Sequence, residues 1–195
     1  MSINCTDREG LERFMKSSLK ESRYRHSLGV QKMASHLAGI YGADIEKAEF
    51  AGRYHDIAKC FDNETMDEAV RKYKLPEEYL GNPALAHSKV AAEILKNEFG
   101  VDDEEVLNAV RSHTTARPGM SLLEEIVYVS DAIEENRNYP QLKKLQKQAE
   151  TDIDGVCLII MDFTIGKIYE KGRVPDDTTL RAREWIKERI GSKQN

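Results

Sequence analysis

His55 and Asp56 are adjacent in the stretch 54–59, where they offer an imidazole nitrogen and two carboxylate oxygens. Consecutive residues of an α-helix diverge by about 100°, so both side chains can reach one metal ion only near a helix end or a bend. In that arrangement the second carboxylate oxygen is free to reach a second metal ion. The pair is therefore a candidate part of a metal site, provided that other ligands converge on it.

Three more histidines and one aspartate lie on or at the start of apolar helix faces; His26, for example, is in line with Val30 and Met33. A lone inward histidine is more often a hydrogen-bonded core residue. Several on different helices would all be satisfied by one shared metal centre, whereas burying each alone is costly. His36 falls off the stripe and is interpreted as a surface or structural histidine. The expected ligands are His26, His55, Asp56, His87, His113 and Asp131.

This ligand set has four imidazoles, two carboxylates and no thiolate, which suits iron(II), manganese, zinc or cobalt. Six protein ligands exceed the needs of a tetrahedral zinc site and fit two metal ions that share a carboxylate. Two metals about 3.5–4 Å apart can hold a hydroxide nucleophile and neutralise charge on a phosphoryl oxygen. The set therefore predicts hydrolysis of a phosphoester or phosphoanhydride, with Asp56 as the bridge.

Positively charged side chains accompany most of the candidate ligands. Any one of them carries little weight, because 29 Lys and Arg in 195 residues place a cation near most positions. Around a dinuclear centre, however, they would together bind a polyphosphate. Lys59, Arg117 and Arg23 are also expected to stabilise the charge that develops during hydrolysis. The expected substrate contacts are Arg23, Lys59, Thr114, Arg117 and Arg137.

The 195 residues predict a single domain spanning residues 1–195. A net charge of −5 and a pI of about 5.6 argue against nucleic acid as the main partner. The odd number of cysteines, without a C-x-x-C pair, indicates reduced thiols in the cytoplasm. The longest apolar run, residues 156–161, is too short to cross a membrane, and the polar, charged N-terminal stretch does not have the apolar core expected of a signal segment. A homodimer remains open.

Nearly every stretch has helical periodicity, so the fold class is predicted to be all-α. Ser22, Asp44 and Ser121 are expected N-caps, and Gly42 and Gly100 are expected to end helices. Residues 79–86 are expected to be loop or a short turn, and Gly166 is a candidate break. Helices are expected near residues 11–19, 22–42, 44–55, 63–73, 87–98, 103–113, 121–134, 141–150, 153–170 and 178–189.

Four stretches form a recognisable set of motifs: residues 23–30 (RYRHSLGV), 55–59 (HDIAK), 113–120 (HTTARPGM) and 130–137 (SDAIEENR). Together they resemble the bacterial YqeK family of HD-superfamily hydrolases, which cleave diadenosine tetraphosphate symmetrically. The resemblance implies a helical bundle with a di-iron centre in its core, held by the six candidate ligands, and cleavage into two ADP. Relatives often carry His-Pro where Val174-Pro175 stands here, so the loop 171–175 is a candidate nucleoside contact.

Three other functions remain open. An HD-type nucleotidase acting on nucleoside monophosphates would use the same centre and would differ in its products. A non-catalytic helical nucleotide-binding module would be expected to lack some of the ligands, all of which are present. A di-iron oxygenase on the same fold would not need so many cations of the kind that bind phosphate.

Overall fold

The computed structural model describes residues 3–193, which form ten α-helices and one short 3₁₀ helix and contain no strand. The all-α prediction is confirmed. The α-helices are α1 (Arg8–Ser18), α2 (Glu21–Tyr41), α3 (Ile45–Tyr54), α4 (Asn63–Lys72), α5 (Pro83–Phe99), α6 (Glu104–Ser112), α7 (Leu122–Ile133), α8 (Leu142–Ala149), α9 (Ile153–Glu170) and α10 (Asp177–Lys193). The 3₁₀ helix, η1, covers Glu77–Tyr79.

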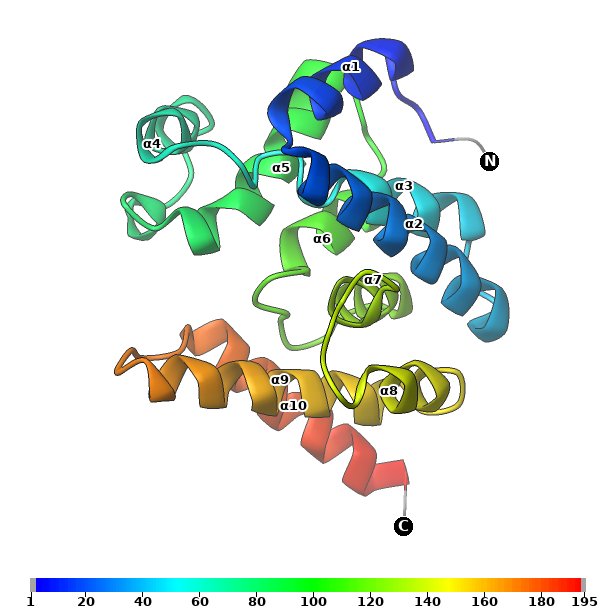
Figure 1. Ribbon diagram of the computed structural model, residues 1–195. Coiled ribbons are helices and arrows are strands. Elements are labelled where there is room, and N and C mark those ends of the chain that lie inside the picture. The colour runs from blue at the N-terminus through cyan, green and yellow to red at the C-terminus, as the bar shows by residue number, and fades with distance from the viewer. Residues whose placement is uncertain (1–2, 194–195) are drawn as a thin grey trace.

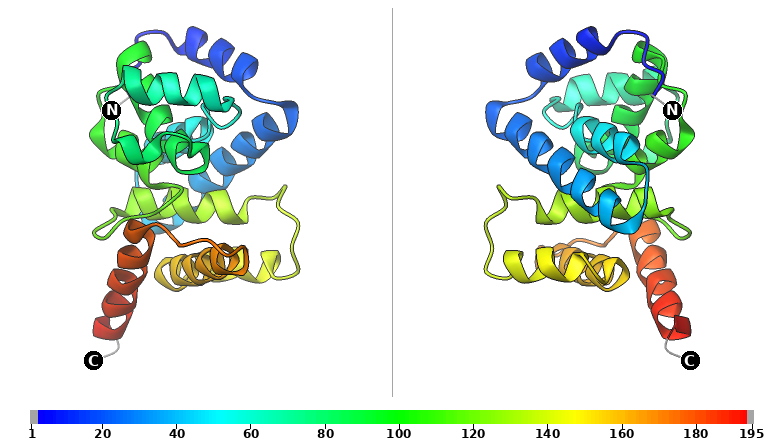
Figure 2. Two further views of the ribbon diagram at one scale, coloured as in Figure 1. Left: turned by 90° about the vertical axis from the view of Figure 1, so that its left-hand side faces the viewer. Right: turned by 90° about the vertical axis from the view of Figure 1, so that its right-hand side faces the viewer.

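Helix α7 lies between the two parts of the molecule. On one side α2 packs along α3 and α7, while α6 packs against α3, α5 and α7. On the other side α9 packs against α7, α8 and α10. Figure 1 shows α8 and α9 as a layer below α7, and Figure 2 shows α10 running away from that layer. The expected metal ligands all precede this layer in the chain, from α2 to α7.

Several helix ends follow the predicted capping signals. The Asp44 side chain accepts a hydrogen bond from the Lys47 amide at the start of α3. Ser121 and Glu124 form a reciprocal capping box at the start of α7. Gly42 ends α2 in the left-handed conformation that glycine adopts without steric cost. Ser22 is not the cap expected of it, because α2 already starts at Glu21 after Lys20.

Helix α5 starts earlier than predicted. Residues 79–86 were expected to be loop because they contain Gly81 and Pro83, yet Pro83 is the first residue of the helix. Proline suits that position, because its fixed φ is helical and its missing amide hydrogen would have no partner there. His87 therefore lies in the second turn of α5 instead of at its start. Gly166 does not interrupt α9, and α10 extends beyond the expected residue 189.

One continuous cluster of buried apolar side chains extends from α1 to α10 and includes Leu11 and Ile186. Cys5, Cys60 and Cys157 are all free thiols, as expected. Among the described residues, no helix is both long enough and apolar enough to cross a membrane.

Candidate metal centre

The six expected ligands converge in the interior. All are buried except Asp131, which is partly exposed. His55 and His113 occupy equivalent positions, since each is the residue that caps the C-terminus of its helix, α3 or α6. His26 comes from α2, His87 from α5 and Asp131 from α7, and Asp56 follows directly on His55. Five helices thus contribute to one cluster.

The end of α3 explains how neighbours in sequence can face the same point. After Tyr54 the chain leaves the helix through a turn, in which the Ile57 amide bonds to the Tyr54 carbonyl and the Lys59 amide to that of Asp56. The His55 imidazole Nε2 lies 3.4 Å from Asp56 Oδ2. The His-Asp pair therefore stands at a helix end, which is where adjacent side chains can share a ligand.

Asp56 lies between two groups of ligands. Its Oδ1 is 3.3 Å from the Nε2 atoms of both His87 and His113. Its Oδ2 faces the other way, 3.4 Å from His55 Nε2 and 3.8 Å from His26 Nε2. Asp131 completes the second group, with Oδ1 2.9 Å from His26 Nε2 and 3.7 Å from His55 Nε2. Each oxygen of one carboxylate thus meets a different set of imidazoles.

The tautomer of each imidazole is set by its outer nitrogen. Nδ1 of His55, His87 and His113 lies 2.8, 3.2 and 2.7 Å from the carbonyl oxygens of Gly52, Pro83 and Val110, respectively. A carbonyl oxygen can only accept, so Nδ1 carries the proton and Nε2 presents a lone pair to the centre.

Some of the converging atoms lack partners of their own. His55 Nε2 and Asp56 Oδ1 are buried and form no hydrogen bond within residues 3–193. Buried polar atoms without partners are costly, and lone pairs facing one another repel. Divalent metal ions would satisfy these atoms together, and the donor set suits such ions. The residues present therefore fit a metal centre.

Electrostatics lead to the same conclusion. Burial opposes charge on Asp56 and Asp131, yet the surrounding imidazoles hold the pKa of each carboxyl well below its usual range. Burial also disfavours the imidazolium of His55, but the charge of Asp56 and the contact with Asp131 raise its pKa to about 10. Burial lowers the pKa of His113 to about 4. The two carboxylates thus favour positive charge at the position that His55 Nε2 faces, which a proton on that nitrogen or, in its place, a metal ion supplies.

Glu134 is a site residue that the sequence interpretation did not assign. It is 1% exposed, and its Oε1 lies 3.1 Å from His26 Nδ1, so this imidazole alone of the four faces a carboxylate instead of a carbonyl. Glu134 Oε2 accepts from the backbone and side-chain amides of Asn136. A Cβ on Gly29 would lie 2.1 Å from that oxygen, so glycine leaves room for it. The sequence feature that could have identified Glu134 as a site residue is its position on the inner face of the predicted helix, one turn after Asp131.

Four of the expected substrate contacts lie at the centre. Arg23 Nη1 is 2.8 Å from Asp56 Oδ2, and Arg137 Nη2 is 2.7 Å from Asp131 Oδ1. Lys59 Nζ is 3.1 Å from His87 Nε2. Thr114 Oγ1 is 3.0 Å from the same atom. Cations therefore border both groups of ligands.

Arg117 was also expected to contact substrate, but the structure places its guanidinium elsewhere. It binds Glu124 through two hydrogen bonds, of 2.7 Å from Nε and 2.6 Å from Nη2. Glu124 is buried and also accepts from the Ser112 hydroxyl and the Ser121 amide. Arg117 is therefore tied to the start of α7 and joins α6 to α7 through this carboxylate.

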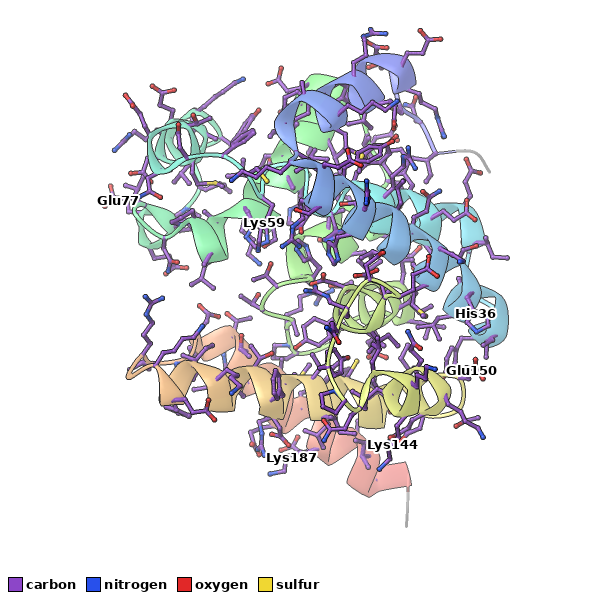
Figure 3. All side chains as sticks on the ribbon, viewed as in Figure 1. His36, Lys59, Glu77, Lys144, Glu150 and Lys187 are labelled. Carbon is purple, nitrogen blue, oxygen red and sulfur yellow. The ribbon has the colours of Figure 1, made fainter. Side chains whose placement is uncertain are left out.

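His36 lies far from the centre, as expected of a surface histidine. It pairs with Glu150, with 3.0 Å between Nε2 and Oε1, and its side chain is half exposed. Figure 3 shows the two residues together at the edge of the molecule, well separated from Lys59.

A cavity of about 600 Å³ adjoins the centre. The polar part of its lining is formed by Lys59, His87, His113, Thr114, Asp131 and Arg137. The rest of its wall comes from α7, from the segment that joins α7 to α8, and from α8 and α9; this part is largely apolar. The centre is thus open to a ligand with a charged part and an apolar part.

Known proteins resemble this chain over most of its length. The family model described as HD domain matches residues 23–136. The symmetrical bis(5'-nucleosyl)-tetraphosphatase of Bacillus subtilis is 39% identical over 173 residues, which make up 88% of this chain and 93% of the relative. The protein of the same name from Halalkalibacterium halodurans is 40% identical over 160 residues, 82% of this chain and 86% of the relative.

A crystal structure from Clostridium acetobutylicum, described as an HD superfamily hydrolase involved in NAD metabolism, is also similar. It has a TM-score of 0.87 and 39% sequence identity, and the match covers 93% of this chain and 97% of the other. The match therefore includes most of the chain beyond residue 136, where the match of the family model ends. The chain belongs to the HD-domain family, in the YqeK branch that its motifs resemble.

Proposed function

We propose that this protein hydrolyses dinucleoside tetraphosphates symmetrically and converts diadenosine tetraphosphate into two ADP. The observation that carries the proposal is the position of Asp56, whose two oxygens face separate groups of imidazoles beside an open cavity. The names of the relatives from Bacillus subtilis and Halalkalibacterium halodurans support the substrate.

The proposed cofactor is a pair of divalent ions, with iron favoured and manganese, cobalt or zinc as alternatives. One group of ligands would be His26, His55 and Asp131, and the other His87 and His113, with Asp56 shared between them. The chemistry that two such ions supply is polarisation of a phosphoryl oxygen and activation of water. Four imidazoles and two carboxylates without a thiolate support this choice of metals.

The cations around the centre are the proposed contacts for the phosphate chain. Lys59 and Thr114 border the Asp56 Oδ1 side, whereas Arg23 borders the Oδ2 side and Arg137 borders Asp131. Charge-assisted hydrogen bonds from these groups would replace the water around the phosphates and stabilise the charge that develops on the leaving diphosphate. Each guanidinium would have to share its present carboxylate partner with the substrate.

A nucleotidase acting on nucleoside monophosphates is the second candidate. The cavity of about 600 Å³ also accommodates a substrate of that size, and the ligands would be the same. The products separate the two functions, because a nucleotidase releases inorganic phosphate.

The experiment is hydrolysis of diadenosine tetraphosphate in water enriched in heavy oxygen, with the products resolved by mass. Attack on a phosphorus next to the central bridging oxygen should give two ADP for each substrate, one of them with a single label on its terminal phosphate. ATP and AMP as the main products would contradict symmetrical cleavage. Release of phosphate from monophosphates, with no turnover of any dinucleotide, would favour the nucleotidase.

We further infer that residues 1–195 act as one domain in the cytoplasm. The continuous apolar cluster from α1 to α10 supports a single folding unit, and the three free thiols suit a reducing compartment. The acidic net charge of −5 supports a small-molecule substrate over nucleic acid.

A further inference from the structure

Helix α9 carries large apolar side chains that are exposed, in addition to those that it buries in the core. Its buried face includes Val156 and Met161, which lie in the core. On another face Ile159 is 41% exposed and Phe163, one turn later, is 66% exposed. A patch of exposed large apolar side chains is a common mark of a binding site. Both side chains line the cavity beside the candidate metal centre.

The segment after α7 supplies a second aromatic ring to the same cavity. Tyr139 and Pro140 belong to its wall, together with Leu145 of α8. The Tyr139 hydroxyl donates a 3.0 Å hydrogen bond to the Ala132 carbonyl, which fixes the orientation of the ring. Lys167, also in the wall, places its ammonium 5.6 Å from the centre of the Phe163 ring. The cavity wall thus combines aromatic rings with cations and with several of the candidate metal ligands.

We propose that the rings of Phe163 and Tyr139 in this wall bind one nucleoside of the substrate. The inference rests on the proposed function. A base can stack on an aromatic face while its phosphates extend to Lys59, Thr114 and Arg137, which line the same cavity. The cavity volume of about 600 Å³ falls within the range of small-molecule binding sites.

This assignment replaces the loop 171–175 as the expected nucleoside contact. None of those five residues lines the cavity, and Val174 is 85% exposed. In this proposal the nucleoside contacts α9 one to three turns before that loop.

The test compares Phe163→Ala with Tyr169→Ala in the metal-loaded enzyme. Tyr169 lies on the same helix, is 56% exposed and does not line the cavity, so it controls for loss of an exposed aromatic ring. Phe163→Ala should weaken ADP binding, measured by calorimetry, by about tenfold. It should raise KM for diadenosine tetraphosphate by a similar factor and leave kcat within twofold. Tyr169→Ala should change neither quantity.

Inorganic pyrophosphate serves as the probe without a base. Its inhibition constant should be the same in Phe163→Ala and in wild type. Unchanged ADP affinity in Phe163→Ala would overturn the proposal and would indicate that the patch serves another purpose, such as contact with a second copy of the chain. Equal weakening of ADP and pyrophosphate would also overturn it, because Phe163 would then shape the whole site.

Failure of the proposed function would look different. If the wild-type enzyme does not cleave diadenosine tetraphosphate but binds ADP in a Phe163-dependent way, the proposed function is wrong and the nucleoside subsite is supported. Cleavage into two ADP with no dependence on Phe163 would retain the reaction and reject the subsite.

Discussion

At the residue scale, the two oxygens of Asp56 face different side chains. Oδ1 faces His87 and His113, whereas Oδ2 faces His26 and His55 and accepts a hydrogen bond from Arg23. An amide at this position would keep the shape but would lose the negative charge and turn one acceptor into a donor. The effect of that change should therefore fall on the centre as a whole.

We expect Asp56→Asn to abolish nearly all turnover while the helical fold persists. Loss of an essential part of a metal-dependent mechanism should cost several kcal/mol of transition-state stabilisation. Steady-state kinetics and circular dichroism are the measurements. A variant that keeps more than about a tenth of the wild-type kcat, a loss of only ~1.4 kcal/mol, would show that Asp56 does not bridge.

His36→Ala is the matched control for changes at a histidine or at an ion pair. His36 contacts Glu150 at the surface, where such pairs contribute about 0–1 kcal/mol. Its activity and metal content should equal those of wild type. A drop in either would mean that the effects of ligand variants cannot be assigned to the centre alone.

At the element scale, helix ends do much of the positioning. His55 and His113 each cap a helix C-terminus and each bond to a carbonyl three residues earlier, in Gly52 and Val110. The sequence predicted these ends well, because apolar periodicity and the following turn residues mark them. It placed His87 wrongly at a helix start, since Pro83 was interpreted as a loop residue when it is the first residue of α5.

Arg117 was expected to contact substrate, and in the fold its guanidinium binds a carboxylate of α7. It extends from the turn after α6 to buried Glu124 in α7, and Ala116, the residue before it in that turn, has a φ of 56°. A positive φ is unfavourable for a residue with a Cβ, so surrounding contacts must maintain it. The turn that carries His113 and Thr114 is thus fixed from its far end.

We expect Arg117→Ala to destabilise the protein by about 1–3 kcal/mol, because Glu124 would stay buried without its main counter-charge. Thermal or chemical unfolding measures this. Arg25→Ala is the control, since Arg25 makes an exposed pair with Glu21 on one helix face and should cost at most about 0.5 kcal/mol. Unchanged stability of Arg117→Ala together with a higher KM would restore Arg117 as a substrate contact.

At the scale of the whole molecule, the sequence indicated the ligands but not how they divide. Helical stripes place each candidate on an inner face, and burial makes a common centre reasonable. Which imidazoles share an oxygen of Asp56 depends on how α2, α5 and α6 are oriented around it, and no local pattern records that. The aromatic part of the cavity wall was also not predicted, because the sequence predicted a helix over this segment without dividing it into buried and exposed faces.

The same view explains why Glu134 and the cavity wall were missed. Both depend on contacts between segments distant in sequence. Glu134 lies 108 positions from His26. Phe163 lines the same cavity as three of the candidate ligands because α9 packs in the layer below α7 (Figure 1). Such contacts follow from helix packing, which is set by the complete core and not by any one stretch.

The metal content of the active enzyme tests the central claim most directly. Elemental analysis of protein purified without oxygen, with activity measured on the same preparation, should give two metal ions per chain. We expect this number because each oxygen of Asp56 faces a different group of imidazoles. One metal ion per chain at full activity would contradict the dinuclear centre.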